Sequence, residues 1–237
     1  TNDASSTGVG TIDSVYQVNT DAGFSIVTYT SNNTAGATVA HGLGKVPAVI
    51  ITKNREDARN WGVYHHMVAS DPETDALFLN LTSAVSDNSA YWNDTAPTST
   101  VFSLGSGAGE TNYPSSDGFV AYCFAEVEGF SRFGRYAGNG NSDGTYIHLG
   151  FKPALFMAKS TGVENWVVMD NARPGYNPTG NYIFWNLSNA EGGAGSEYVD
   201  LLSNGVKLKT TGASANGSVD FIYMAWAEMP AKYSLAF

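Results

Sequence analysis

Short runs of β-branched and aromatic residues recur along the chain, and each run ends in a cluster of Gly, Pro, Asn or Ser. This is the pattern of strands joined by turns. In the first half the runs are 24–29, 48–51, 75–81, 100–104 and 119–127. Side chains alternate between two faces along 119–127, and both faces are largely apolar, as in a strand packed on two sides. No stretch of about ten residues or more keeps a helical period. The pattern predicts an all-β protein.

Four blocks of the first half recur in the same order in the second half. They pair 41–53 with 147–159, 60–65 with 165–170, 77–84 with 183–190, and 118–126 with 220–228. The first pair, HGLGKVPAVIITK and IHLGFKPALFMAK, keeps a glycine, a proline and a final lysine at the same spacing. Such self-similarity marks a duplicated unit, here of about 105 residues.

We therefore predict two tandem, pseudo-equivalent β-sandwich units of jelly-roll type that arose by internal duplication. Residues 1–22 are expected to form an N-terminal arm or linker. The first repeat is expected to span 23–133 and the second 134–237.

The stretch GNGNSDG at 138–144 matches the first half of an Asn/Asp-rich calcium loop. The bidentate Glu that such a loop needs at its twelfth position is replaced by Gly150. A phosphate cradle would need a GK[ST] sequence and a following helix, and neither is present. The aligned stretch SNNTAG at 31–36 has no carboxylate at all. We interpret 138–144 as a hairpin turn and expect no metal site and no cofactor.

The charge balance argues against several partners. The 237 residues include 12 Lys and Arg against 22 Asp and Glu, a net charge of −10. This charge repels phosphate backbones and anionic membranes. No apolar run reaches the roughly 18 residues of a membrane span. We expect no nucleic acid partner and no membrane insertion. The single cysteine, Cys123, is interpreted as a small buried hydrophobe.

The sequence contains few candidates for catalytic residues. The histidines His41, His65, His66 and His148 do not have a metal-ligand spacing. Glu126 and Glu228 could form the two carboxylates of a glycoside hydrolase. Because they fall at matching positions of the two repeats, a local role at the end of a strand is preferred. We expect that the protein is not an enzyme.

Aromatic residues divide into two groups. Trp61 aligns with Trp166, which predicts burial of both rings. Other aromatics, among them Trp185 and Tyr198, lack an aromatic counterpart and lie mostly near loops. Exposed rings on loops stack on the apolar face of a pyranose, while amides and carboxylates bond its hydroxyls. The candidate binding set comprises Tyr91, Trp92, Asn93, Asp94, Tyr113, Tyr176 and Asn177.

Five blocks carry a resemblance to a known family: GFSIVTYT, HGLGKVP, WNDTAPTSTVFSLG, GFVAYCFAEVEGFSRFGRYAGNG and LLSNGVKLKT. Over residues 23–234 the chain resembles a domain family of unknown function that occurs in tail-fibre-like and other structural proteins of marine bacteriophages. The resemblance implies a virion protein, in the extracellular particle, that belongs to a tail fibre or appendage with a receptor-binding role. It supplies no catalytic residues.

Three classes of function follow. The first is a virion structural protein that attaches to a host receptor, such as a surface glycan, in contact with other virion proteins. The alternatives are a non-catalytic carbohydrate-binding module or a virion decoration or filament protein. A polysaccharide-degrading enzyme is the least favoured class, because no carboxylates cluster in the sequence.

The segment 1–22 bears on assembly. It is too polar to form a core alone, but Ile12, Val15, Tyr16 and Val18 give it a short strand-like stretch. We expect a homo-oligomer, a trimer or a filament, in which this arm adds as a strand to a neighbouring chain. A disordered linker is the alternative.

Overall fold

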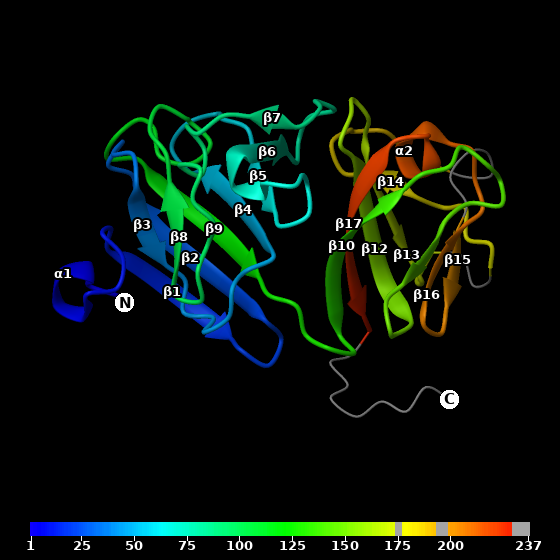
Figure 1. The fold of residues 1–237 in the computed structure, drawn as a ribbon, viewed down its shortest axis with the longest axis horizontal. Helices are drawn as coiled ribbons and strands as arrows, with labels where there is room; N and C mark the ends of the chain where they lie inside the picture. The colour runs from blue at the N-terminus through cyan, green and yellow to red at the C-terminus, as the bar shows by residue number, and fades with distance from the viewer. Residues whose placement is uncertain (174–176, 193–198, 229–237) are drawn as a thin grey trace. The chain divides into compact units, whose positions relative to one another are not determined.

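The computed structural model describes residues 1–173, 177–192 and 199–228, which are built almost entirely of strands (Figure 1). These residues form seventeen strands and two four-residue α-helices, α1 (Ala4–Thr7) and α2 (Ala213–Asn216). The prediction of an all-β protein is confirmed. The chain divides into two compact units, residues 1–79 with 85–126, and residues 80–84 with 127 onward.

The first unit is based on a seven-stranded antiparallel sheet in the order β1-β2-β9-β4-β5-β6-β7. Its strands are β1 (Ser14–Asn19), β2 (Phe24–Thr30), β4 (Val49–Asn54), β5 (Gly62–His65), β6 (Asp75–Phe78), β7 (Ser86–Asp87) and β9 (Gly118–Phe124). A 3-10 turn, η1 (Pro72–Thr74), precedes β6. A separate antiparallel pair joins β3 (Ala37–Ala40) to β8 (Val101–Leu104).

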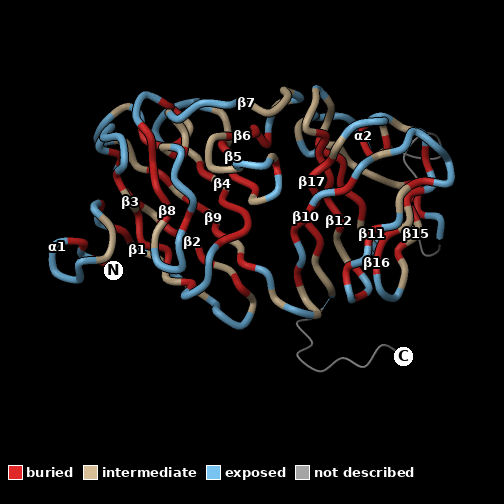
Figure 2. The backbone as a smooth tube through the Cα atoms, in the orientation of Figure 1, coloured by how far each residue is buried: buried red, intermediate tan, exposed pale blue. Residues whose placement is uncertain are grey.

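The central strand β9 shows how the sequence pattern produces the first core. Phe119, Ala121 and Cys123 are fully buried, whereas the residues between them are half-buried. Side chains of the β3–β8 pair, including Phe102 and Leu104, complete this core. The alternation predicted for 119–127 is confirmed, but the expected packing of both faces is not, because the second face is only half-buried. The unit has the two layers of a β-sandwich-like fold. Figure 2 shows the buried stretches running along these strands.

The second unit contains a five-stranded antiparallel sheet in the order β10-β17-β12-β13-β14 and a three-stranded sheet in the order β11-β16-β15. The larger sheet consists of β10 (Ser131–Ala137), β12 (Pro153–Ser160), β13 (Trp166–Asp170), β14 (Ile183–Phe184) and β17 (Asp220–Ala227). The smaller sheet consists of β11 (Tyr146–His148), β15 (Val199–Leu202) and β16 (Gly205–Leu208).

The second core is again enclosed by two sheets. Phe156, Val167 and Phe221 come from the larger sheet, and Ile147 and Val206 come from the smaller one. All five side chains are buried. The unit begins before the expected boundary at 133–134, because that boundary falls inside β10.

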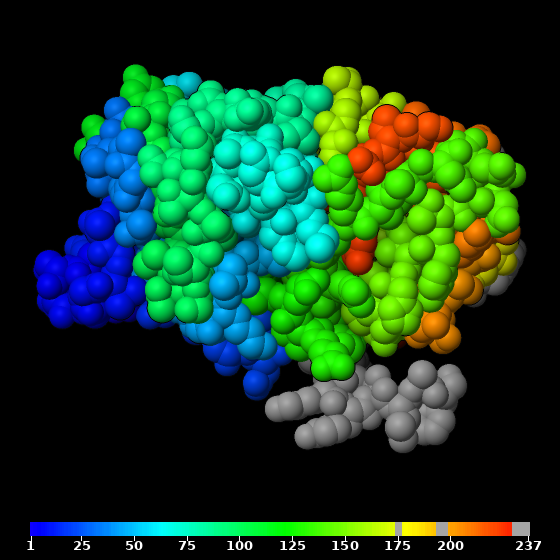
Figure 3. Space-filling model, in the orientation of Figure 1, coloured from blue at the N-terminus to red at the C-terminus, as the bar shows by residue number. Residues whose placement is uncertain are grey.

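Residues 1–22 differ from the expected arm. Strand β1 pairs along its full length with β2 of the same chain. Ile12 is 6% exposed and enters the first core, and its backbone N–H donates to Thr38 O (3.1 Å). Figure 3 shows the first residues, in dark blue, packed against the first unit. The segment is therefore part of the first unit and not a separate linker, because its few apolar residues complete a core already formed by β2, β3 and β8.

The loop 138–144 is also different from the interpretation. It leaves β10 and enters β11, which lie in different sheets, so it crosses between layers and is not a hairpin turn. Thr145 Oγ1 donates to Ala137 O (2.6 Å) as the chain makes this crossing. The Asn-Gly and Asp-Gly pairs were correct indicators of a turn, but they do not determine which strands the turn connects.

Candidate functional site

Three loops of the first unit are joined by hydrogen bonds, and we call this group the loop end. The loops are residues 31–36, 88–95 and 105–117. At their centre is Asn112, which is fully buried. Its Oδ1 accepts from the backbone N–H groups of Asn32 (3.0 Å) and Asn33 (3.2 Å). Its Nδ2 donates to the carbonyl oxygens of Gly105 (2.8 Å) and Thr34 (3.2 Å). One side-chain amide thus provides partners for four backbone groups.

Further contacts attach the remaining parts of the loop end. The N–H of Gly107 donates to Asn33 Oδ1 (2.8 Å), and the N–H of Gly105 donates to Tyr91 O (3.0 Å). The side chain of Asn93 reaches the first loop, since its Nδ2 lies 3.7 Å from the position of a Cβ built on Gly36. The three loops therefore form one connected surface.

The loop end also concentrates unusual backbone conformations. Asn33, Asn93, Asp94 and Ser116 have φ angles of 53°, 58°, 45° and 81°. Over the described ranges these are the only non-glycine residues with positive φ. Asn and Asp tolerate this region better than other side chains, whereas Ser does so at a cost. Such conformations gather at functional sites, where surrounding contacts hold them in place.

Five of the seven predicted binding residues lie in the loop end, among them Asn93, Asp94 and Tyr113. Tyr113 is 40% exposed. Asp94 is exposed and Asn93 is half-buried, with its Nδ2 donating to Thr95 Oγ1 (3.3 Å). The three loops are rich in amides and hydroxyls, groups that form neutral hydrogen bonds.

Trp92 and Tyr91 were predicted to be exposed, and this prediction is wrong for Trp92 and only partly met by Tyr91. Trp92 is only 2% exposed and belongs to the first core, where its ring meets Tyr64 edge-to-face at 5.8 Å. Its Nε1 has no hydrogen-bond partner within the described part of the chain. Tyr91 is half-buried against the same core and packs edge-to-face on Phe78 at 5.7 Å. The cause is a compact turn at 88–95, closed by Asn93 N–H donating to Ser89 O (2.9 Å), which directs both rings inward.

The second unit has its own central amide. Asn216 is fully buried, and its Oδ1 accepts from the backbone N–H of Asn139 (3.1 Å). Its Nδ2 donates to Thr210 O (2.7 Å), Asn141 O (2.8 Å) and Asn139 Oδ1 (2.9 Å). The 138–144 loop, which carries Asn139 and Asn141, also contains Asp143, whose carboxylate lies 2.7 Å from Lys207 Nζ. This hydrogen bond, the largest cause, lowers the pKa of Asp143.

The other predicted residues do not join a binding surface in the second unit. Asn177 is exposed, but its side chain forms two backbone hydrogen bonds with Leu201, each 3.0 Å long, and so acts as a structural bridge. Tyr176 lies outside the described residues. Trp185 was not in the candidate set, yet it is 53% exposed. The aligned Leu79 is buried, and this replacement of a buried Leu by Trp was a signal in the sequence.

The paired tryptophans also differ. Trp166 is fully buried, as predicted. Trp61 is only half-buried and stacks on Tyr122, with ring centroids 6.4 Å apart.

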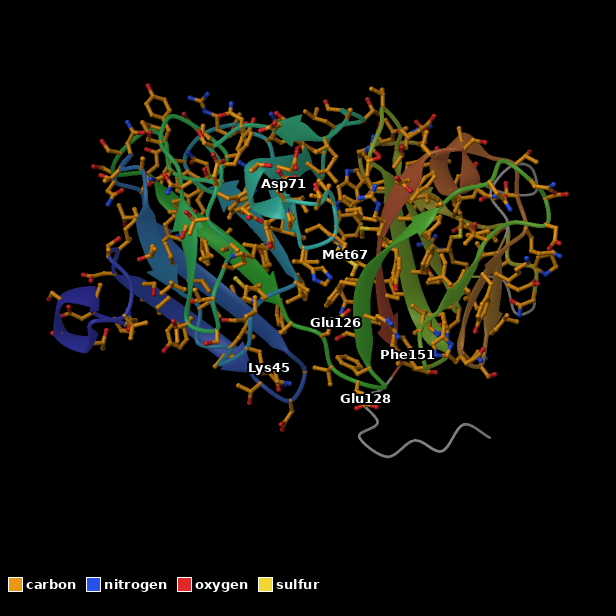
Figure 4. All side chains as sticks on the ribbon, viewed as in Figure 1. Lys45, Met67, Asp71, Glu126, Glu128 and Phe151 are labelled. Carbon is orange, nitrogen blue, oxygen red and sulfur yellow. The ribbon has the colours of Figure 1, made fainter. Side chains whose placement is uncertain are left out.

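The candidate catalytic groups lie on different elements of the two units. Glu126 and Glu228 are both exposed. Glu126, labelled in Figure 4, follows shortly after the end of β9, and Glu228 directly follows β17. His41 is buried, with Nδ1 accepting from the N–H of Leu43 (3.2 Å) and Nε2 3.2 Å from Thr98 O. Burial lowers the pKa of His41. Among the residues described, no three His, Cys, Asp or Glu side chains are grouped to hold a metal ion.

Comparison with known proteins identifies the family. Residues 1–230 match the model named Domain of unknown function (DUF7483), and the chain belongs to this family. No curated protein and no solved structure matches the chain. In the described part of the chain, no helix is long and apolar enough to cross a membrane.

Proposed function

We propose that this chain is a non-catalytic attachment module that binds a carbohydrate on a host cell surface as part of a bacteriophage tail fibre or another virion appendage. The observation that carries the binding proposal is the loop end, where the exposed ring of Tyr113 shares a hydrogen-bonded group of loops with exposed amides and hydroxyls.

The chemistry of the loop end suits a sugar. A pyranose presents ring C–H groups on one face, which stack on an aromatic ring, and hydroxyls at its edge, which bond neutral donors and acceptors. Asn32 and Asn93 offer amides in the same group of loops as Tyr113. Asn112 holds 31–36 against Gly105, whose N–H in turn holds the 88–95 loop at Tyr91 O. A preformed surface loses less conformational entropy when it binds its ligand.

Binding without catalysis is the second part of the proposal. Hydrolysis of a glycosidic bond requires two carboxylates on opposite sides of the bond. At the loop end, Asp117 Oδ2 accepts a hydrogen bond from Asn54 Nδ2 (2.8 Å), which assigns this carboxylate a structural role. Glu110 Oε1 likewise accepts from Asn60 Nδ2 (3.1 Å), and Asp94 is the one exposed carboxylate of the three.

A glycan array with the full-length chain, followed by calorimetry on the best ligand, tests this function. Tyr113→Ala and Asn93→Ala should each weaken binding by about tenfold or more, a change of about 1.4 kcal/mol. Trp185→Ala, which removes another exposed aromatic, is the matched control and should bind normally. Unchanged binding in Tyr113→Ala refutes the site. Release of reducing ends from a bound polysaccharide refutes the non-catalytic role.

The virion location rests on the resemblance of the five sequence blocks to phage structural proteins. Immunogold microscopy of purified particles with an antibody against this chain tests it. Labelling of a tail or another appendage supports the proposal, and unlabelled particles that contain no peptide of the chain refute it.

We also propose a homo-oligomer, with a trimer as the expected form. In support, β1 is the edge strand of the seven-stranded sheet, and edge strands can pair with another chain. Val15 on β1 and Ile26 on β2 are 53% and 40% exposed. Light scattering at tens of micromolar measures the mass. A monomer refutes the proposal, and Val15→Lys should shift an oligomer towards the monomer.

The two units are proposed to be copies of one ancestral fold. The strand order β2-β9-β4-β5-β6 has its counterpart in β10-β17-β12-β13-β14. Tyr29 OH donates to Thr111 O (2.6 Å), and Tyr136 OH donates to Ala215 O (2.6 Å). Each of these tyrosines stacks on a phenylalanine of the next strand, at 5.4 Å and 5.0 Å. The buried amides of Asn112 and Asn216 each directly follow the residue whose carbonyl accepts the hydrogen bond from that tyrosine. An experimental structure with Pro47 and Pro153 at unrelated positions refutes the duplication.

A further inference from the structure

Tyr146, on the three-stranded sheet of the second unit, is 43% exposed and its ring lies over Gly205 of the neighbouring strand. Its Cε2 and hydroxyl oxygen lie 3.1 Å and 3.0 Å from the position of a Cβ built on Gly205. The ring therefore covers a place where the neighbouring strand has no side chain. The Tyr146 hydroxyl donates to Asn204 O (3.4 Å) and lies 3.3 Å from His148 Nδ1. These two contacts orient the hydroxyl end of the exposed ring.

Gly205 is a requirement of this arrangement. A Cβ at this position would also lie 2.2 Å from the backbone oxygen of Ile147, so no side chain fits without a movement of the backbone. Tyr146 and Gly205 are diagonal neighbours on adjacent strands, since Tyr146 is paired directly with Lys207. The geometry of the strands thus places an aromatic ring against the outer surface of the sheet.

Polar groups flank the ring on both sides. His148 follows two positions along β11 and is exposed. Across the strand pair, Lys207 Nζ donates to Gly144 O (2.5 Å) and lies 2.7 Å from Asp143 Oδ1. Asp143 is 83% exposed and has oxygen atoms accessible to a ligand. The next strand places Asp200 opposite Lys207. The ring is therefore bordered by hydrogen-bond donors and acceptors that include both positively and negatively charged side chains.

We propose that this surface is a second carbohydrate subsite, in which a pyranose stacks on Tyr146 and its hydroxyls bond His148, Asp143 and Lys207. A flat ring with polar groups at its rim fits a ligand that has an apolar face and a polar edge, which is the shape of a pyranose. The balanced charge of Lys207 and Asp143 favours a neutral sugar over a uronate. The inference shares its ligand class with the proposed function, but it uses different residues in a different unit.

The test is an NMR titration of the ¹⁵N-labelled full-length chain with methyl glycosides of glucose, galactose, mannose and glucuronic acid. Saturable shifts are expected at 143–149 and 203–208 with at least one neutral glycoside. Tyr146→Ala should weaken this binding by about tenfold or more, whereas Tyr146→Phe, which keeps the ring, should stay within about threefold.

Tyr113→Ala is the matched control, because Tyr113 has a similar exposure of 40% but lies in the first unit. It should leave the shifts at 143–149 unchanged. The subsite is refuted if no glycoside gives saturable shifts there, if only the uronate does, or if Tyr146→Ala binds as well as the parent chain. Binding lost in Tyr113→Ala and kept in Tyr146→Ala would support the loop end alone.

Discussion

Replacement of Trp92 by Ala tests the assignment of this residue to the core. Trp92 is 2% exposed and packs edge-to-face on Tyr64. A buried Trp or Phe replaced by Ala costs about 3–5 kcal/mol of unfolding free energy, and an aromatic pair adds about 0.5–1.5 kcal/mol. In the opposite direction, the indole Nε1 is buried without a partner, a cost of about 1–3 kcal/mol that the substitution removes. The two corrections nearly cancel, so Trp92→Ala should cost about 3–4 kcal/mol.

Trp92→Phe separates the two contributions. It keeps an aromatic ring against Tyr64 and removes the unpartnered N–H, so that its cost should be about 1 kcal/mol or less. Trp185→Ala is the control, because this side chain is 53% exposed and its loss should change stability by about 0.5 kcal/mol at most.

Urea unfolding followed by circular dichroism gives the free energies. Because the two units can unfold separately, hydrogen exchange at Phe119 and Ala121 provides a second measurement that is specific to the first unit. Losses of the same size for Trp92→Ala and Trp185→Ala would refute the burial of Trp92. A Trp92→Phe variant as unstable as Trp92→Ala would show that the indole N–H has a partner.

Three further predictions concern buried and charged groups. Asn112→Ala should cost about 1–3 kcal/mol for each backbone group that stays buried without a partner. Asn112→Asp keeps an acceptor for the N–H groups and should recover part of the loss in melting temperature; equal losses contradict the hydrogen-bond assignment. His41 has a lowered pKa in the folded protein, so the unfolded chain takes up a proton first as the pH falls. The stability that His41 contributes above pH of about 6.5 should therefore decline as the pH falls through its folded-state pKa. Comparison of urea midpoints at several pH values should show a smaller decline in His41→Asn, and an unchanged decline refutes the assignment. Finally, millimolar calcium should not raise the melting temperature, since Asp143 is paired with Lys207. A rise of several degrees that Asp143→Ala abolishes would contradict this expectation.

The sequence predicted those parts of the fold that depend on local alternation. The two faces of β9 could be derived from the period of two in 119–127, but the face that enters the core could not, because both are largely apolar. The paired blocks located β4, β5 and β9 and their counterparts. The turn residues at 138–144 were recognised, but the sheets that they connect depend on pairings distant in sequence.

The candidate site was predicted less well. The burial of Trp92 results from the turn at 88–95 and from its bond to Gly105, a contact between loops that no local pattern reveals. Ile12 and β1 were recognised as strand-like, but the partner of an edge strand cannot be read from the strand itself. Tyr146 was missed for the same reason, because its position depends on Gly205 in another strand.

The partners of Asn112 have a consequence for how this surface can change. Its four hydrogen bonds of 3.2 Å or shorter all reach main-chain atoms. Most side chains of the 31–36 loop are therefore not specified by these bonds. Thr34 can therefore be exchanged for many residues while the backbone around it stays in place. A library randomised at Thr34 and at neighbouring exposed positions should contain many folded members with altered ligand preference. The same property would let natural selection diversify recognition while the scaffold remains constant.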